Sequence, residues 1–422
     1  MRSSREEAGA ARWRRAGAAI AVGVALALAG PVHAAEEEAP TVRAEVGKPV
    51  QAAQGLMKDK RYAEALAKLA EADAVANKTP FEAYTIERTR GVIALNSGDL
   101  AQAEKSFDTV LASPRATLAD KQQLSGALVA PLYNAKEFAR AARWIQRFQA
   151  EGGQNAQFTA ILANALYLAG DNAAAAKALE GELAADQAAG RKTDEERLKL
   201  LASVRLKQKD GDGYRQVLER LVADYPSKAY WADLVYRTDS REGFADRLSV
   251  DAYRLRRAVG ALTEPGDYME LAQLAAEHAS FTEGSQVMEA GYAAGVLGSG
   301  ADAPRQQQLR TKLAQQARDE AAEVKRGGFK PATGPAMLNV GFAQVTNGAV
   351  EPGLAMIRQG IAKGGLKSPD DGPLRLGEAL VLAGRPDEAA QAFAQVKGSD
   401  GAADLARLWQ LHLRQPPAAA PK

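Results

Sequence analysis

Residues 376–396 read LGEALVLAGRPDEAAQAFAQV, two apolar segments of helical periodicity on either side of a short break. Gly384 and Pro386 lie in the break, and these two residue types interrupt helices. The second segment carries an apolar stripe at i, i+4 and i+7, formed by Ala389, Phe393 and Val396. The stretch therefore predicts a helical hairpin.

The same pattern recurs along the chain. In eight stretches a residue is followed four positions later by a bulky apolar one, and in seven of them the earlier residue is alanine or glycine. A small residue lets two helices approach, and a large one fills the space between hairpins. The intervals 214–281 and 281–350 are each long enough for one further hairpin. The eight pairs are Ala65 and Leu69, Ala103 and Phe107, Ala141 and Ile145, Ala175 and Leu179, Val217 and Leu221, Gly284 and Met288, Gly353 and Ile357, and Ala389 and Phe393.

These hairpins resemble the tetratricopeptide repeat (TPR) family. Its signature has a small residue, a glycine and an aromatic on the first helix, then an alanine and a phenylalanine on the second. The resemblance covers most of 45–415, although the family's tryptophan and closing proline are mostly missing. It implies an all-α fold, a right-handed α-solenoid of antiparallel helix hairpins whose concave face commonly binds peptides or partner proteins. The best matches are Gly91, Gly98, Ala103 and Phe107, and then Gly377, Leu380, Gly384, Ala389 and Phe393.

Residues 1–34 have the organisation of a secretory signal peptide. Three arginines precede the apolar run AGAAIAVGVALALAG, which is shorter than the roughly 20 residues of a membrane span. Val32 and Ala34 then fit the small-residue positions that a signal peptidase reads, which predicts cleavage after Ala34. The alternative is a leader that is retained as an anchor.

Charge and cysteine content narrow the class of protein. The leader holds five arginines and two acidic residues, so its removal changes the formal charge from +2 to −1. A nearly neutral chain lacks the basic footprint of a nucleic-acid-binding protein. With no cysteine the chain forms no disulfides and no thiolate metal sites, so its stability must come from helix packing. We therefore expect a periplasmic protein with no membrane span after cleavage.

The residue types that carry chemistry are sparse. His278 and His412 are the only histidines after the leader, and each stands alone, which favours helix-end or surface positions over a metal site. No serine occupies a G-x-S-x-G nucleophile elbow, and no two carboxylates are singled out as a glycosidase pair. We expect no catalytic residue, no metal and no cofactor.

The glycine-rich stretch AGVLGSGADA at 294–303 fits either a phosphate-binding loop or a joint between helices. A phosphate loop would follow a strand and begin a helix, and no strand-like alternation precedes this one. A shift of 69 residues aligns Gly291 and Gly295 with two further glycines. The sequence thus predicts a close-packing position at Gly291, a left-handed helix cap at Gly295, and Leu297 folded back on the helix.

Residues 305–327 read as a long polar helix with a narrow apolar stripe. Such a helix either binds a partner or packs one edge on the solenoid and leaves the rest in water. The organisation that we expect is a signal peptide at 1–34, a flexible N-terminus at 35–44, TPR-like repeats at 45–226, a degenerate helical segment at 227–267, TPR-like repeats at 268–415, and a disordered tail at 416–422.

Candidate partner-binding residues come from the first helix of each hairpin, whose exposed side lines the concave surface in this architecture. Asparagine and tyrosine side chains in consecutive hairpins would bond an extended peptide backbone and offer rigid contact area. The alternative is ordinary surface polarity. The candidates are Arg88, Asn96, Tyr133, Asn134, Asn164, Tyr167, Gln273, Glu277 and Glu378.

The favoured hypothesis is a non-catalytic periplasmic scaffold that binds a protein or peptide partner in a preformed groove. Residues 268–300 and 395–413 resemble exported proteobacterial repeat proteins, some of them assigned to TonB energy-transducing systems, which implies partners in a TonB-type or other cell-envelope complex. Two alternatives stay open: a periplasmic chaperone for outer-membrane proteins, and a cell-wall enzyme or enzyme subunit that uses the solenoid as a frame.

Overall fold

The computed structural model describes residues 41–415, and all of its regular structure is helical. These residues form 20 α-helices and one short 3₁₀-helix, with no β-strand among them. None of these helices is long and apolar enough to cross a membrane. The predicted leader, its cleavage site and the predicted tail at 416–422 lie outside the described residues. The all-α architecture of antiparallel helix hairpins is confirmed.

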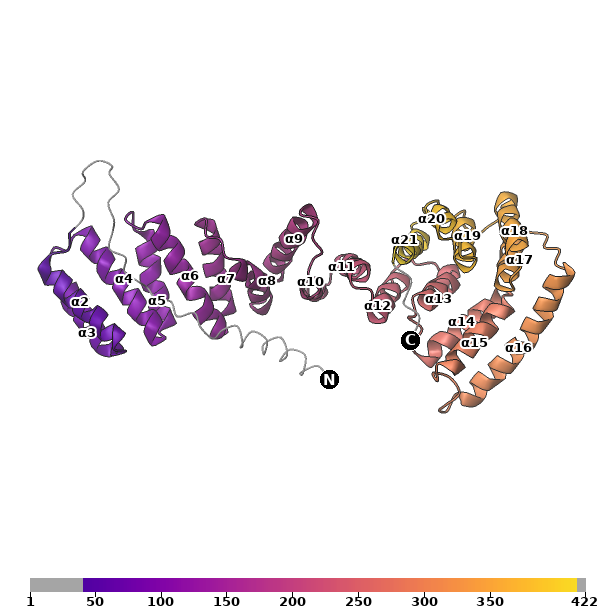
Figure 1. Cartoon of the computed structure of the whole chain (residues 1–422), viewed down its shortest axis with the longest axis horizontal. Helices are drawn as coiled ribbons and strands as arrows, with labels where there is room; N and C mark the ends of the chain where they lie inside the picture. Colours follow the sequence, from indigo (N-terminus) through magenta and orange to yellow (C-terminus); the bar gives the residue numbers. More distant parts are fainter. Residues whose placement is uncertain (1–40, 416–422) are drawn as a thin grey trace. The chain divides into compact units, whose positions relative to one another are not determined.

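The described chain forms two compact units, 41–179 and 180–415. In the first unit, consecutive helices pair as hairpins and pack in chain order (Figure 1). Its helices are α2 (Ala44–Lys58), α3 (Tyr62–Asp73), α4 (Pro80–Ser97), α5 (Leu100–Ala112), α6 (Leu118–Asn134), α7 (Phe138–Ala150), α8 (Ala156–Leu168) and the start of α9 (Asn172–Ala188). The repeat blocks expected at 45–226 and 268–415 stay a prediction.

The second unit contains the end of α9 and the remaining elements. Hairpins again dominate it, formed by α10 with α11, α14 with α15, α17 with α18, and α19 with α20. The elements are α10 (Glu195–Lys207), α11 (Gly211–Asp224), α12 (Lys228–Asp239), η1 (Asp246–Leu248), α13 (Ser249–Ala258), α14 (Pro265–Glu277), α15 (Phe281–Ala293), α16 (Ala303–Arg326), α17 (Gly334–Thr346), α18 (Val350–Lys363), α19 (Asp371–Leu382), α20 (Pro386–Phe393) and α21 (Ala402–Leu413).

The small-then-bulky pairs lie where the sequence pattern placed them, on the second helix of each hairpin. All sixteen residues of the eight pairs are buried. The packing role is explicit at Gly91, where an added Cβ would lie 2.5 Å from the Phe107 ring, and at Gly377, at the same distance from Phe393. The bulky residue of each of these two hairpins therefore packs against a glycine on the preceding helix.

Each hairpin turn has the same backbone geometry. The first helix is followed by a residue at positive φ, and the N–H of the next residue donates to the carbonyl four residues before the positive-φ residue, as in a Schellman motif. Glycine occupies this position in four hairpins, but Lys60, Lys136, Lys209 and Ala279 occupy it in the others. The turn is therefore set by the helix-ending hydrogen bonds as well as by glycine.

The glycine-rich stretch 294–303 is a joint between helices. Gly295 follows α15 with a φ of +68°, and the N–H groups of Val296 and Leu297 both donate to the Gly291 carbonyl. Leu297 is buried, and an added Cβ on Gly291 would lie 2.6 Å from its Cδ1 atom. All three sequence predictions for this stretch are confirmed.

Gly295→Ala should lower the free energy of unfolding by about 1 kcal/mol. An added methyl group has room there, but the positive φ of residue 295 is unfavourable for an L-residue. Urea denaturation followed by circular dichroism measures the change. Gly181→Ala is the matched control, since Gly181 lies inside α9 with nothing within 4 Å of an added Cβ, and it should be neutral or stabilising. Equal effects of the two substitutions would contradict the assignment.

The second unit closes on itself, with its C-terminal end packed against its early helices (Figure 1). Gln415 accepts a hydrogen bond from Trp231 Nε1 at 3.3 Å and donates one to the Val222 carbonyl at 2.9 Å. Arg247 bonds to Asp371 at 2.9 Å and to Asp400 at 2.5 Å. These contacts join residues more than 120 positions apart. Arg254 of α13 likewise bonds to Glu378 of α19, so these two helices face each other within this unit.

The two long intervals between clear repeats differ. The first holds α12, η1 and α13, which is compatible with a degenerate hairpin. The interval 281–350 is long enough for a further hairpin but does not contain one: beyond α15 and α17 it holds a single 24-residue helix, α16. Its polar sequence offers one narrow apolar stripe, enough to pack one edge but not to build a second helix pair.

Candidate partner-binding surface

The first helices of the unit 41–179 make polar contacts with one another, and one set of these contacts surrounds Arg88 on α4. Arg88 forms an ion pair with Asp120 of α6 at 3.3 Å and donates a hydrogen bond to Gln123 Oε1 at 3.3 Å. Tyr84 lies one turn earlier on α4. Burial raises the pKa of its hydroxyl to about 12, and the Asp120 carboxylate adds to the shift. Two successive first helices, α4 and α6, are thus tied together by the polar contacts of Arg88.

Tyr133 and Asn164 form a separate polar contact between α6 and α8. Asn164 Nδ2 donates a hydrogen bond of 2.8 Å to the Tyr133 hydroxyl, and both side chains are half-buried. Burial raises the pKa of Tyr133, while the bond from Asn164 opposes the shift. The phenol therefore stays neutral at physiological pH. The Tyr133 O–H group and the Asn164 Oδ1 atom therefore form a preformed pair of one hydrogen-bond donor and one acceptor.

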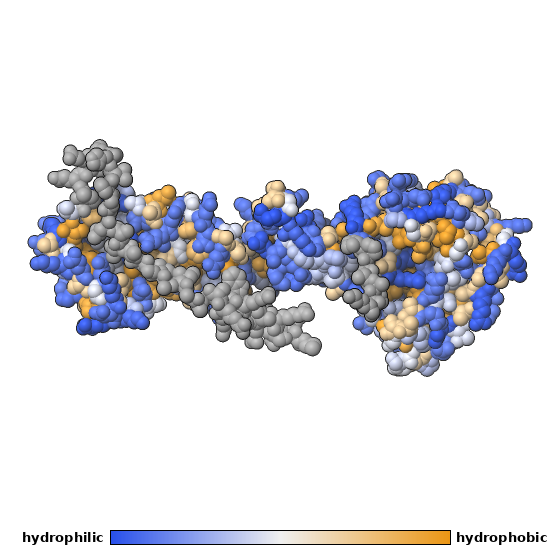
Figure 2. Space-filling view, viewed as in Figure 1, coloured by the Kyte–Doolittle hydropathy of each residue, from blue (hydrophilic) through white to orange (hydrophobic). Residues whose placement is uncertain are grey.

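The remaining candidates of this unit lie at the C-terminal ends of the same helices. Asn96 and Asn134 are exposed, and Tyr167 is half-buried. Asn96 donates to the Val92 carbonyl at 2.8 Å and borders a small pocket between α4, α5 and α6, which Gln123 also lines. Figure 2 shows hydrophilic residues interspersed with small hydrophobic patches over the visible face of this unit. The structure thus places all six predicted residues on α4, α6 and α8, and it joins two of them directly.

The candidates of the unit 180–415 have different surroundings. Gln273 and Glu277 lie on α14, half-buried and exposed respectively. Glu378 was expected on an exposed surface, and that expectation is wrong, because its residue is only 2% exposed. The closure of this unit brings α13 against α19, so the face that would line a groove is filled by side chains instead.

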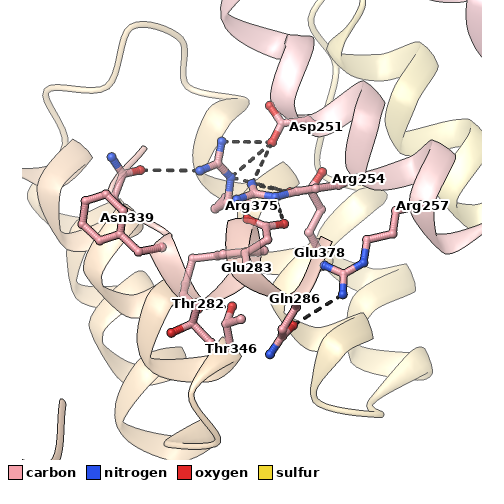
Figure 3. A network of polar contacts seen from close by, with 12 residues as sticks. Asp251, Arg254, Arg257, Thr282, Glu283, Gln286, Asn339, Thr346, Arg375 and Glu378 are labelled. Atoms are coloured by element: carbon pink, nitrogen blue, oxygen red, sulfur yellow. Dashed lines mark hydrogen bonds and ion pairs between the residues drawn. The ribbon is translucent and has the colours of Figure 1, made fainter. Parts of the chain in front are cut away.

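Glu378 belongs to a buried ionic cluster that joins α13, α15 and α19 (Figure 3). Arg254 bonds in a bidentate manner to Glu283, with distances of 2.9 and 2.7 Å, and donates to Glu378 Oε2 at 3.2 Å. Arg375 donates to Asp251 Oδ1 at 2.9 Å. All five side chains are at least nine-tenths buried. We call this set the buried ionic cluster; it comprises Asp251, Arg254, Glu283, Arg375 and Glu378.

An aromatic ring and an amide complete the surroundings of the two arginines. The guanidinium of Arg254 lies 3.7 Å from the centroid of the Phe342 ring on α17, a cation–π contact in a dry environment. Arg375 Nη1 lies 3.5 Å from Asn339 Oδ1 on the same helix (Figure 3). Four helices far apart in sequence therefore converge on this cluster.

The charges of the cluster balance only if one acid keeps its proton, because three carboxyl groups face two guanidinium groups. Burial alone would raise the pKa of Glu283, but Arg254, with smaller effects from Arg257 and Arg375, holds it below its usual value. Burial, together with the negative Asp251, raises the pKa of Glu378 well above its usual value. Burial and the two arginines lower the pKa of His278, at the end of α14, to about 4, so it is neutral at pH 7. These opposite shifts favour the neutral form at Glu378 and the carboxylate at Glu283.

Glu378→Gln should stabilise this unit increasingly as the pH rises, because glutamine has the shape of the neutral acid and does not ionise. The folded-state pKa of Glu378 is raised, so its contribution to stability is present below the unfolded pKa of about 4.5 and is lost as the pH rises above it. The difference between variant and wild type should grow by up to about 1.4 kcal/mol per pH unit. Urea unfolding at pH 5 and pH 7 measures it, and an unchanged difference would contradict a protonated Glu378.

The buried ionic cluster is suited to hold helices together and not to turn over a substrate. Its carboxylates are paired with arginines in a water-excluded interior, and neither of the two pockets near α4 and α16 is lined by them. Within the described residues no group of three or more histidine, cysteine, aspartate and glutamate residues could hold a metal ion. His278 follows α14 and His412 lies in the last turn of α21, so both are at helix ends, as the sequence predicted.

Sequence reasoning missed the residues that act between helices. Asp120 and Gln123 order Arg88, but nothing in the hairpin signature marks them. Glu320 of α16 accepts hydrogen bonds from the backbone N–H groups of Phe281 and Thr282, and so caps α15 where Ser280 makes no side-chain cap. A capping partner that belongs to another helix leaves no local sequence signal.

No family model and no curated protein sequence matches the chain. Among solved structures it is similar to yeast Tom70 (8% identity, TM-score 0.25, 87% of this chain and 95% of that chain covered). It is also similar to a chain of the Naa15/Naa10 complex bound to HypK-THB (14% identity, TM-score 0.27, 86% of this chain and 58% of that chain covered). A third similar structure is the TPR domain of P58(IPK) (13% identity, TM-score 0.22, 89% of this chain and 100% of that chain covered). At these TM-scores the likenesses carry no inference about function.

Proposed function

We propose that this chain is a non-catalytic helical-repeat scaffold that binds a protein or peptide partner on the first-helix face of the unit 41–179. The observation that carries the proposal is the pair Tyr133 and Asn164 on α6 and α8, whose side chains are already joined by a 2.8 Å hydrogen bond. A donor and acceptor pair held in place before binding lowers the entropy that a partner must lose. The unit 180–415 is a poorer candidate, because its own side chains fill the corresponding face around Glu378.

The proposal places the protein in the periplasm, with a TonB-type energy-transducing system or another cell-envelope complex as its setting. The leader-like sequence of 1–34 supports export, and the resemblance to exported repeat proteins supports the setting. N-terminal sequencing of the protein purified from a periplasmic extract tests this part. A mature chain that begins at Ala35 is expected, and an intact leader in a membrane fraction would favour the retained anchor.

Photo-crosslinking tests the binding face. A photoreactive residue at Asn134 or Tyr167 should capture the same partner reproducibly in the living cell, and the same residue at Tyr236 should not. Tyr236 is a matched control, because it is an exposed aromatic residue on α12 in the other unit. Capture from Tyr236 alone, or no reproducible partner from any position, would overturn the proposed face.

A further inference from the structure

Helix α16 has no hairpin partner. It follows α15 and precedes α17 in the chain, and it packs along α15 (Figure 1). Leu313 anchors this edge, fully buried in a cluster that includes Val287 and Met288 of α15. Because α16 is the one helix between α15 and α17 in the chain, no second helix pairs with its other side.

A groove of about 430 Å³ runs beside this uncovered side. One wall is a single helical stripe of α16, with residues spaced by three or four positions. The opposite wall is apolar and comes from α17, from the start of α15 and from the segment after α16. The lining residues are Gln316, Asp319, Glu320, Glu323 and Arg326 on the first wall, and Ala279, Phe281, Phe329, Val340 and Ala343 on the second.

The groove is held open by a fixed contact at its base. Glu320 Oε2 accepts from the N–H of Phe281 at 2.6 Å, and its Oε1 accepts from Asn347 Nδ2 at 2.6 Å. Thr282 Oγ1 in turn donates to Asn347 Oδ1 at 3.1 Å. This network ties α16 to the N-terminus of α15 and to the end of α17, so the two walls are set at a fixed separation.

The charge of the α16 wall indicates what would enter. Its lining includes three carboxylates and one guanidinium, and Arg326 is already bonded to Glu323 at 2.5 Å. The Oε1 atom of Gln316 is buried and has no hydrogen-bond partner. A buried acceptor without a partner costs free energy that an incoming donor would recover. The wall therefore favours cationic donors, while the facing wall favours apolar side chains.

We propose that the groove between α16 and α17 binds a basic amphipathic helix of a partner protein, which takes the place of the missing hairpin helix. The apolar stripe of the incoming helix would pack on Phe281, Phe329 and Val340, and its lysine or arginine residues would face Asp319 and Glu323. Recognition by a helix in a groove reads side chains at i, i+3, i+4 and i+7, the spacing that the α16 wall itself presents. This site is separate from the first-helix face of the other unit, so either can fail without the other.

Two synthetic peptides of about 18 residues test the site, a length at which helices begin to form in water. One carries leucine at i, i+3, i+4 and i+7 with flanking lysines, and the other has glutamate in place of every lysine. Fluorescence anisotropy with the full chain should show binding of the lysine peptide at least tenfold tighter than that of the glutamate peptide. The double variant Asp319→Lys and Glu323→Lys should reverse this preference.

Two further variants separate the groove from general charge effects. Asp387→Lys combined with Glu242→Lys makes the same charge change at exposed positions outside the groove and should leave the preference unchanged. Val340→Glu places a charge on the apolar wall and should weaken binding of the lysine peptide at least tenfold. Circular dichroism checks that each variant is folded. Equal binding of the two peptides, or a preference that Asp319→Lys and Glu323→Lys do not alter, would overturn the proposal, as would a dimer of the chain that Val340→Glu dissociates.

Discussion

Arg254→Met is expected to lower the free energy of unfolding of the unit 180–415 by about 3–5 kcal/mol, the effect typical of removing one partner from a buried ion pair. The substitution leaves Glu283 as a buried carboxylate without its bidentate partner, and it removes the 3.2 Å bond to Glu378. Methionine keeps much of the apolar volume beside Phe342, so the loss reports the charge and not a cavity. Urea denaturation, with hydrogen exchange of α13, α15 and α19, measures it.

Arg310→Met provides the matched control. Arg310 also bonds to a glutamate, Glu289, but this pair lies at the surface, with 33% and 49% of the two side chains exposed. An exposed pair contributes about 0–1 kcal/mol. A similar loss from the two substitutions would contradict the account of the buried ionic cluster.

The double variant Arg254→Met and Glu283→Gln separates the missing bond from the unpaired charge. It removes one positive and one negative group together, so the net charge of the cluster stays as in the wild type. We expect it to recover at least about 1 kcal/mol of the loss, because an uncompensated buried charge is the largest part of the penalty. A double variant less stable than the single one would indicate that Glu283 stabilises the fold by other contacts.

The elements that the sequence predicted well are those fixed within one hairpin. Ala103 four residues before Phe107 indicates a buried stripe whatever the rest of the chain does, because both lie on one helix face. Gly295 and Leu297 are likewise defined by the end of their own helix. Helical periodicity and capping operate over a few residues, which a single sequence contains in full.

The side chain of Glu378 could not be placed in this way. Its position on the first helix of a hairpin was right, but its partner Arg254 is 124 residues away, and it is buried only because α13 packs near α19. The groove beside α16 depends in the same way on Glu320 reaching α15, across 39 residues. Repeat patterns describe contacts between neighbouring hairpins, so they do not predict contacts between the distant helices of a unit that closes on itself.

Gly341→Ala is expected to lower the free energy of unfolding by about 2–3 kcal/mol, because the backbones of α17 and α18 meet at this residue. An added methyl group would lie 2.6 Å from the Gly353 carbonyl oxygen and 2.9 Å from the Ile357 nitrogen. Both atoms belong to the main chain, so the overlap is relieved only if the two helices separate. Gly353 is the small residue of its repeat, and an added Cβ there would meet the Gly341 oxygen at 2.5 Å.

Gly55→Ala distinguishes this close approach from the general effect of replacing glycine in a helix. Gly55 lies inside α2 with nothing within 4 Å of an added Cβ, so alanine should stabilise that helix by about 0.5–1 kcal/mol. Thermal and urea unfolding of the two variants should therefore shift in opposite directions. A stabilising Gly341→Ala would mean that α17 and α18 can move apart freely, and it would remove the reason for small residues at this position of the repeat.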